Sequence, residues 1–458
     1  MNFALAEIAA AFPCRIIGAL SQDALAGVST DTRRVQPGEL FVALRGDVYD
    51  GHEFVLAALA KGAVALLVDH HYVEQQEQLP RGTFIIVDDT LKAYQQLARF
   101  YRNKLSPTVV ALTGSAGKTT CKEFIHAVLS EKYSVHRNAR SFNNHVGVPA
   151  TLLELTPQHQ ILVTELGTSH FGEIANLSFL VQPDVCLLLN IGYAHLEFLN
   201  DLDGVARAKM EIFAHAAADN IAIYNADDAL LSRQIFPSAE KMTFAIKAPA
   251  DVRAGDIRCD ERACYAFTVR NAPFQLAIPG RHNVYNALAA IAVGLQFKVP
   301  LARMAAAIAR VTAVEHRMTV LHRRDVTIID DAYNANPGSC AVALETLADF
   351  QIGAGGRRIA VIGDMLELGD CSQREHEKLA AVAQQNNVDA LFLYGDASAA
   401  TAERAKQLPF LYVGHFKGQS DLAAELAGFL SRGDVVLVKG SRAMHMENVV
   451  HALMDGEK

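Results

Sequence analysis

At 458 residues, the chain has room for about three domains, because domains usually contain ~100–200 residues. Hydrophobic residues make up 51% of the chain, charged residues make up 20%, and the mean hydropathy is +0.13, which together exclude a disordered protein. The formal net charge of -8 and the absence of any run of lysines or arginines argue against nucleic acid as a partner.

The N-terminus and the cysteines indicate the cellular compartment. The opening MNFALAEIAAAF carries Glu7 and no basic leader, so it predicts an amphipathic helix rather than a signal peptide. No apolar run approaches the length of a membrane span. The seven cysteines are scattered and lack CxxC spacing, which favours reduced thiols over disulfides or a zinc site. We therefore expect a cytoplasmic protein.

Apolar runs alternate with helical patterns in three successive parts of the chain. Residues 1–105 mix short strands with helices, residues 106–312 open with the buried-strand pattern TVVALT, and residues 313–458 begin a second series of short apolar runs. The pattern predicts a small α/β domain, a central domain with a parallel sheet, and a doubly wound C-terminal domain of the Rossmann-like kind.

The strongest local signal is TGSAGKTT at residues 113–120, between a strand pattern and a helical pattern. Glycines let backbone N–H groups approach phosphate oxygens, and a helix N-terminus favours anions. Leu112 stands where the usual motif has its first glycine, so this is a shortened variant. A simple glycine-rich turn is the alternative. The residues expected to cradle a nucleoside triphosphate are Gly114, Ser115, Ala116, Gly117, Lys118, Thr119 and Thr120.

A site that binds triphosphate also needs a divalent cation, usually magnesium, to offset the phosphate charge. The hydroxyl of Thr119 is one candidate ligand. Glu165 follows the strand ILVT and His195 follows the strand VCLLL, at the strand ends where open α/β sheets bind ligands. A solvated loop carboxylate and a packed histidine are the alternatives for the last two residues.

Several ordered motifs resemble those of the Mur ligases, which build peptidoglycan precursors. Besides the phosphate loop they are SFNNHVGVPATLLEL (141–155), TELGTSHFGEI (164–174), NIGYAHLEFL (190–199) and GRHNVYNALAA (280–290). The resemblance covers nearly the whole chain. It implies an ATP- and Mg²⁺-dependent ligase that activates a carboxylate as an acyl phosphate and couples it to an amine.

Three C-terminal motifs narrow the resemblance to the branch that joins D-alanyl-D-alanine to UDP-N-acetylmuramoyl-tripeptide. They are IIDDAYNANPGS (328–339), VIGDMLELGD (361–370) and VLVKGSRAMHME (436–447). The D-N-P-R motif of the diaminopimelate-adding sister is absent, whereas a lysine-adding sister and folylpolyglutamate synthase stay as alternatives. A GTPase switch is disfavoured because no N-K-x-D motif occurs. The implied partners are the two substrates, without nucleic acid or membrane, and we expect a monomer.

The resemblance also implies roles for individual residues. The expected catalytic residues are Lys118, Glu165, His195, Lys209 and Arg317, with Arg317 moving onto the γ-phosphate when the domains close. Lys209 matches a family lysine that in some members forms a carbamate with carbon dioxide; an unmodified lysine on a solvated helix face is the alternative. Further ATP contacts are expected from His282, Asn283, Asn286, Asp331 and Tyr333. Capping of the helix explains part of the pattern at Asn283.

Substrate contacts are expected in two further groups. The UDP-sugar-peptide group comprises Ser29, Thr30, Asp31, Arg33, Arg45, Asn143 and Asn144. For its first-domain members, a polar turn with a surface salt bridge is the alternative. The dipeptide group comprises Asn334, Asn336 and Ser339, and a strand end carrying Lys439, Ser441 and Arg442 is suited to binding a carboxylate.

Overall fold

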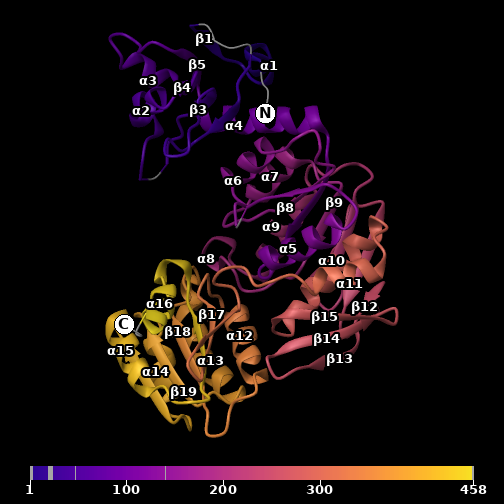
Figure 1. Ribbon diagram of the computed structural model, residues 1–458, viewed down its shortest axis with the longest axis vertical. Helices are drawn as coiled ribbons and strands as arrows, with labels where there is room; N and C mark the ends of the chain where they lie inside the picture. The colour runs from indigo at the N-terminus through magenta and orange to yellow at the C-terminus, as the bar shows by residue number, and fades with distance from the viewer. Residues whose placement is uncertain (1–3, 19–23, 47, 140, 456–458) are drawn as a thin grey trace.

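The computed structural model describes residues 4–18, 24–46, 48–139 and 141–455, and it contains three α/β units in chain order. Figure 1 shows the first unit at one end, the central unit beside it, and the C-terminal unit packed against the far part of the central unit. This arrangement confirms the predicted three-domain α/β fold. In the described part of the chain, no helix is long and apolar enough to cross a membrane.

The first unit is built on a five-stranded sheet in the order β1-β5-β4-β3-β2. The edge strand β1 runs antiparallel to β5, and the other pairings are parallel. Of the predicted N-terminal helix, residues 1–3 lie outside the described residues. The elements are α1 (Leu5–Ala11), β1 (Arg15–Ile17), β2 (Gly27–Ser29), β3 (Glu39–Val42), α2 (Val55–Ala60), β4 (Ala65–Asp69), α3 (His70–Glu74), β5 (Thr83–Val87) and α4 (Thr90–Leu105).

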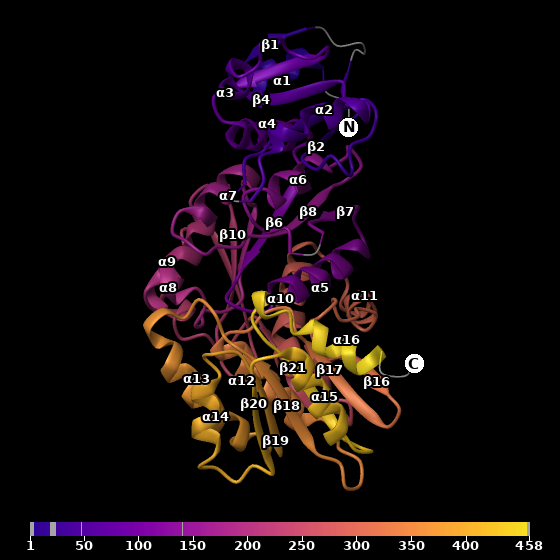
Figure 2. The ribbon, with the colours of Figure 1, turned by 90° about the vertical axis from the view of Figure 1, so that its left-hand side faces the viewer.

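Helix α4 connects the first unit to the central unit (Figure 2). Its buried residues recur at helical spacing along one face, from Ala93 and Tyr94 to Leu97 and Tyr101. These side chains share one apolar core with the first sheet and with helices α6 and α7 of the central unit. The helix therefore belongs to the packing of both units, and it fixes the first unit on one face of the central sheet.

The central unit contains a parallel seven-stranded sheet in the order β12-β11-β10-β9-β6-β8-β7. Successive residues of β6 face opposite sides, so Val110 and Leu112 pack towards α5 and α10, whereas Val109 and Ala111 pack towards α4 and α7. The elements are β6 (Thr108–Thr113), α5 (Lys118–Ser130), β7 (Val135–Arg137), α6 (Gly147–Leu153), β8 (Ile161–Glu165), α7 (Glu173–Val181), β9 (Val185–Leu188), α8 (Leu196–Leu199), α9 (Leu202–Met210), β10 (Ile221–Asn225), β11 (Glu240–Ala245), β12 (Val252–Arg253), α10 (His282–Gln296) and α11 (Leu301–Ile308).

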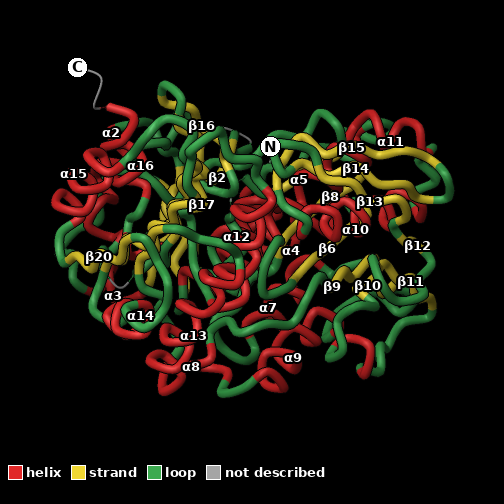
Figure 3. Tube along the Cα trace, turned by 90° about the horizontal axis from the view of Figure 1, so that it is seen from below, coloured by secondary structure: helices red, strands yellow, loops and turns green. Residues whose placement is uncertain are grey.

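A three-stranded antiparallel sheet, β13 (Gly255–Cys259), β14 (Cys264–Val269) and β15 (Ala272–Pro279), follows the parallel strands. We did not predict this sheet from the sequence as a separate element. It shares an apolar core with α12 (Pro337–Asp349) of the C-terminal unit, and the hydroxyl of Tyr265 donates a hydrogen bond of 2.6 Å to Asp349. In the view from below, α12 lies between the C-terminal strands and the central unit (Figure 3).

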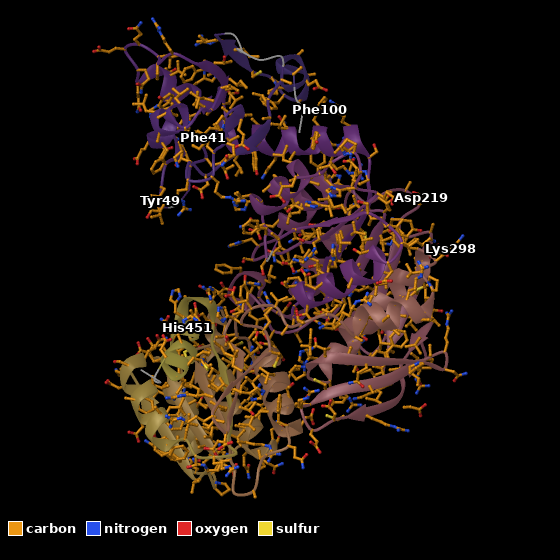
Figure 4. The ribbon with its side chains drawn as sticks, viewed as in Figure 1. Phe41, Tyr49, Phe100, Asp219, Lys298 and His451 are labelled. Atoms are coloured by element: carbon orange, nitrogen blue, oxygen red, sulfur yellow. The ribbon has the colours of Figure 1, made fainter. Side chains whose placement is uncertain are left out.

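The C-terminal unit has a six-stranded sheet in the order β16-β17-β21-β18-β19-β20, parallel apart from the hairpin of β16 and β17. Figure 4 shows His451 on the side of this unit that faces the first unit. Tyr49, which belongs to the first unit, is labelled on the opposite side of the gap between the two ribbons. The remaining elements are β16 (Thr319–Arg323), β17 (Val326–Asp331), β18 (Arg358–Gly363), α13 (Ser372–Gln385), β19 (Ala390–Tyr394), α14 (Ala399–Ala405), β20 (Tyr412–Phe416), α15 (Gln419–Phe429), β21 (Val435–Lys439) and α16 (Glu447–Asp455).

Candidate active site

A cavity of about 1140 Å³ lies where the three units meet. The N-terminal end of α4 lines it from the first unit, the phosphate loop and the ends of β8, β9 and β10 line it from the central unit, and Asp331 to Ser339 line it from the C-terminal unit. Open α/β sheets bind ligands at the carboxyl ends of their strands, and this cavity has that position. A second cavity, between α5 and α11, has a volume of only about 420 Å³.

The phosphate loop forms hydrogen bonds with the loop after β9. The side chain of Asn190 accepts from the N–H of Ala116 at 2.9 Å and donates to the carbonyl of the same residue at 3.1 Å. The hydroxyl of Ser115 donates to the carbonyl of Gly192 at 3.0 Å. Asn190 was not among the predicted site residues, although its place after the strand VCLLL was the available signal.

Gly117, at the N-terminus of α5, lies beneath the side chain of Asn286. Its φ of 82° is in the left-handed region, and a Cβ atom here would lie 2.6 Å from Oδ1 of Asn286. Asn286 is in turn held by Asn283, whose Oδ1 accepts from Nδ2 of Asn286 at 2.9 Å. Glycine is therefore required at this position for two reasons. The backbone has a left-handed conformation, and the side chain of Asn286 on α10 leaves no room for a Cβ atom.

Thr119 and Glu165 meet beneath the phosphate loop. Glu165 ends β8 with 0% of its surface exposed, and its Oε2 accepts from the hydroxyl of Thr119 at 3.0 Å. Nδ2 of Asn143 donates to Oε1 of Glu165 at 3.4 Å. A hydroxyl and a carboxylate side by side provide the oxygen ligands that Mg²⁺ prefers, so these two predicted ligands fit the ion.

The third predicted metal ligand, His195, contacts the C-terminal unit. Its Nδ1 lies 2.6 Å from Oε2 of Glu367 and 3.5 Å from the hydroxyl of Ser169. His195 lines the same cavity as Thr119, but no hydrogen bond links it to Glu165 among the described residues. The partner Glu367 was not a predicted site residue, because nothing in the chain pattern pairs positions 172 residues apart.

Two lysines with lowered pKa values interact electrostatically with each other, and one of them, Lys118, also interacts with Glu165. Nζ of Lys118 donates to the carbonyl of Gly114 at 2.7 Å, and burial lowers the pKa of its amine, although the charge of Glu165 acts against this shift. Lys209, on α9, is 2% exposed, and burial lowers the pKa of its amine well below the usual value, with Lys118 acting in the same direction. No hydrogen bond or ion pair of the Lys209 amine occurs within the part of the chain that the structure describes. Its environment is therefore different from the solvated helix face considered as the alternative.

Arg317 reaches from the start of the C-terminal unit into the central unit. Its guanidinium donates to the hydroxyl of Ser141 at 3.1 Å and lies 3.9 Å from the ring centre of Tyr333. The Ser141 hydroxyl lies 3.3 Å from that of Thr119, so a chain of polar contacts joins Arg317 to the phosphate loop. Nε of Arg317 is buried without a partner among the described groups, which leaves one donor for a ligand. Ser141 was missed from the sequence because a serine in a loop carries no distinctive spacing.

His282 and Asn283 begin α10 at the wall of the cavity. Burial lowers the pKa of His282 to about 4, so its ring is neutral at pH 7, and its Nδ1 is buried without a partner among the described groups. Asn283 donates from Nδ2 to the carbonyl of Pro279 at 2.7 Å. The cap of α10 is Arg281, without a side-chain hydrogen bond, so the capping role considered for Asn283 is wrong.

The C-terminal side of the cavity is organised by Lys439 and Asn336. Nζ of Lys439, which is 3% exposed, donates to Oδ2 of Asp331 at 2.6 Å and to the carbonyl of Asn334 at 2.9 Å. Asn336 caps α12 by accepting from the N–H of Ser339 at 2.8 Å, and the Ser339 hydroxyl accepts from the N–H of Asn336. These residues line the cavity, but Lys439 is already paired with a carboxylate of the protein.

The predicted UDP-sugar-peptide residues lie in two places. Asn143 and Asn144 line the cavity, and Oδ1 of Asn144 accepts a hydrogen bond of 2.8 Å from the N–H of Gly147, the first residue of α6. In the first unit, Arg33 is exposed and pairs with Asp31 at 2.8 Å, and Arg45 pairs with Asp69 at 2.8 Å. The residues that do not line the cavity are Ser29, Thr30, Asp31, Arg33 and Arg45.

Comparison with known proteins gives a consistent result along the chain. The family model of the Mur ligase middle domain matches residues 112–294, that of the Mur ligase glutamate ligase domain matches residues 316–442, and that of the Mur ligase family catalytic domain matches residues 24–102. The chain is 36% identical to the UDP-N-acetylmuramoyl-tripeptide--D-alanyl-D-alanine ligase of Bacillus subtilis, over 95% of this chain and 94% of the relative.

Solved structures show the same similarity. MurF from Acinetobacter baumannii superimposes with a TM-score of 0.90 at 30% identity, covering 99% of both chains. The MurF ligase of Thermotoga maritima, whose crystal structure is a complex with ADP, superimposes with a TM-score of 0.79 at 28% identity, covering 93% of this chain and 96% of that one.

Proposed function

Because the chain belongs to the Mur ligase family, we propose that it joins D-alanyl-D-alanine to UDP-N-acetylmuramoyl-tripeptide with cleavage of ATP to ADP and phosphate. The relatives named for this reaction match over almost the full length of the chain. The observation that carries the proposal is the meeting of the phosphate loop and Arg317 around one cavity, where Thr119 of that loop contacts the buried Glu165.

The first step is the attack of the tripeptide's terminal carboxylate on the γ-phosphate of ATP. Phosphoryl transfer depends mainly on positioning and on stabilising the charge that develops on the transferred group. Lys118 follows the glycines of the loop, and Arg317 approaches the same loop through Ser141. Both cations are therefore available to the phosphoryl oxygens, and the product of this step is an acyl phosphate.

Magnesium is the divalent cation that this donor set fits, and Thr119 and Glu165 would hold it, with His195 as a further ligand. When bound, the ion offsets the negative charge of the β- and γ-phosphates. The Glu165 carboxylate, fully buried and accepting from Thr119 and Asn143, is fixed in orientation before any ligand arrives.

Carbamate formation at Lys209 is part of the proposal. Carbon dioxide reacts with a neutral amine, and burial lowers the pKa of this lysine, which favours the neutral form of the amine. The carbamate would place an anionic oxygen at the end of the Lys209 side chain, which forms no hydrogen bond or ion pair with the described residues. It would also reduce the repulsion from Lys118.

In the second step the amine of D-alanyl-D-alanine attacks the acyl phosphate, and phosphate leaves. We assign the dipeptide to the C-terminal wall of the cavity, formed by Asn334, Asn336 and Ser339. Water would hydrolyse the acyl phosphate, so the reaction requires the C-terminal unit to cover it.

Three further properties stay predictions. They are the domain bounds at residues 1–105, 106–312 and 313–458, a monomeric state and a cytoplasmic location.

Oxygen transfer tests the reaction type. With ¹⁸O in the terminal carboxylate of the tripeptide, an acyl phosphate mechanism moves one labelled oxygen to the released phosphate. Mass spectrometry should find that label in the phosphate of every turnover. Unlabelled phosphate together with pentapeptide product would rule out activation by phosphorylation of the carboxylate.

A further inference from the structure

His195 and Glu367 form a direct polar contact between the central unit and the C-terminal unit. Nδ1 of His195 lies 2.6 Å from Oε2 of Glu367. The backbone supports the same contact, because the N–H of Glu197 donates to the carbonyl of Glu367 at 3.3 Å. Glu367 lies in the loop between β18 and α13, so a residue far along the chain reaches the first turn of α8.

Both residues of this pair have an unusual backbone conformation. The φ angle is 53° at His195 and 61° at Glu367, in the left-handed region that residues with a side chain seldom occupy. Such a conformation is unfavourable, and it persists where the surrounding structure fixes it, often at functional sites. The donor and the acceptor of this hydrogen bond both have this backbone conformation, which indicates that the surrounding structure determines the orientation of the pair.

The hydrogen bond determines which ring nitrogen of His195 carries the proton. An ionised carboxylate only accepts hydrogen bonds, so Nδ1 must be the donor. Glutamate side chains are ordinarily ionised at neutral pH. In the neutral ring the lone pair then lies on Nε2, which makes no hydrogen bond with the described part of the chain. Histidines that bind metals commonly use this arrangement, in which the second nitrogen donates to a carboxylate.

We propose that Glu367 is a positioning residue, supplied by the C-terminal unit, that holds His195 in the tautomer whose Nε2 binds a divalent cation. The inference rests on the magnesium site of the proposed function. It adds that the affinity of this site depends on the docking of the C-terminal unit, because the carboxylate comes from there. Metal binding and the position of that unit are therefore linked through one side chain.

Binding of Mn²⁺, measured by electron paramagnetic resonance without substrates, tests the proposal. Loss of the carboxylate partner of a metal-binding histidine typically weakens metal binding ~10–100-fold, so Glu367→Ala should weaken Mn²⁺ binding ~10-fold or more. If Glu367 acts through His195, the double variant Glu367→Ala/His195→Ala should bind no more weakly than His195→Ala alone. The control is Asp370→Ala, three residues away on an exposed side chain, which should bind as the wild type does.

Three results would overturn the inference. The first is unchanged Mn²⁺ binding in folded Glu367→Ala, and the second is the absence of specific Mn²⁺ binding to the wild type. The third is a double variant whose loss of affinity is the product of the two single losses, since Glu367 would then act independently of His195. Failure of the proposed function has a different signature: the wild type would make no pentapeptide product, whatever the Mn²⁺ measurements show. Thermal unfolding of each variant identifies any loss that comes from misfolding.

Discussion

Arg317 of the C-terminal unit donates a hydrogen bond of 3.1 Å to the hydroxyl of Ser141 in the central unit. The same hydroxyl lies 3.3 Å from Thr119, which contacts Glu165. Ser141 therefore connects Arg317 to the predicted magnesium ligands. Arg317 reaches this serine because the C-terminal unit packs against the central unit. The stacking of Arg317 on Tyr333 at 3.9 Å holds the other face of the guanidinium.

Removing the Ser141 hydroxyl should slow the reaction. A hydrogen bond to a charged group contributes ~1.5–3 kcal/mol, which corresponds to a ~10–100-fold effect if the bond orients Arg317 in the transition state. Ser141→Ala should therefore lower kcat/KM for ATP by about that factor, measured by phosphate release. Ser141→Thr keeps the hydroxyl and should recover most of the rate. Equal rates for Ser141→Ala and the wild type would remove this serine from the mechanism.

Gly117→Ala should abolish ATP binding. The new Cβ would lie 2.6 Å from Oδ1 of Asn286, and the φ of 82° is unfavourable for alanine. Gly172 provides a matched control, because its φ is 85° but a Cβ there would meet nothing within 4 Å. Calorimetric titration with ATP should show loss of binding in Gly117→Ala and near-normal binding in Gly172→Ala. Equal effects would mean that backbone strain, rather than the packing of α10, accounts for this glycine.

Lys209→Met should abolish turnover while the protein stays folded. Methionine has a similar volume to the lysine side chain and carries no amine to be buried without a partner, so the unfolding temperature should not fall. The wild type should also lose activity in buffer depleted of carbon dioxide and regain it with bicarbonate. A Lys209→Met variant with near-normal turnover would remove both the lysine and its carbamate from the mechanism.

His282 should make the protein less stable in mild acid. Its pKa is about 4 in the folded protein, because of burial, and ~6.5 in an unfolded chain, so the unfolded state binds the proton more readily. The free energy of unfolding should thus fall as the pH decreases from ~6.5 towards 4. Chemical denaturation of His282→Asn should show a smaller fall over this range. A variant with the same pH dependence as the wild type would contradict the assignment.

The sequence predicted those features whose signal is local. The buried-strand pattern, the glycines and the helix that follows predicted both the strand β6 and the phosphate loop, which lie where expected. Glu165 and His195 were found because they follow apolar strands, and strand ends gather at one edge of a parallel sheet. The alternation of apolar runs with helical patterns predicted the order and number of the units.

The sequence did not predict contacts that depend on how the units dock. Glu367 and Ser141 lie in loops without periodicity, and their partners are 172 and 176 residues away in the chain. The separate antiparallel sheet β13-β14-β15 was missed because short alternating strands look alike whether they extend a parallel sheet or form their own. For the first unit, neighbouring charges explain why Arg33 and Arg45 form ion pairs within the protein.

Selection among amines tests the central claim most directly. Phosphate release from ATP is measured with Mg²⁺ and UDP-N-acetylmuramoyl-tripeptide, while D-alanyl-D-alanine, diaminopimelate and lysine are offered separately. We predict release, with one pentapeptide product per phosphate, for the dipeptide alone. Release with a single amino acid and none with the dipeptide would contradict the proposed function and would assign the chain to a sister ligase.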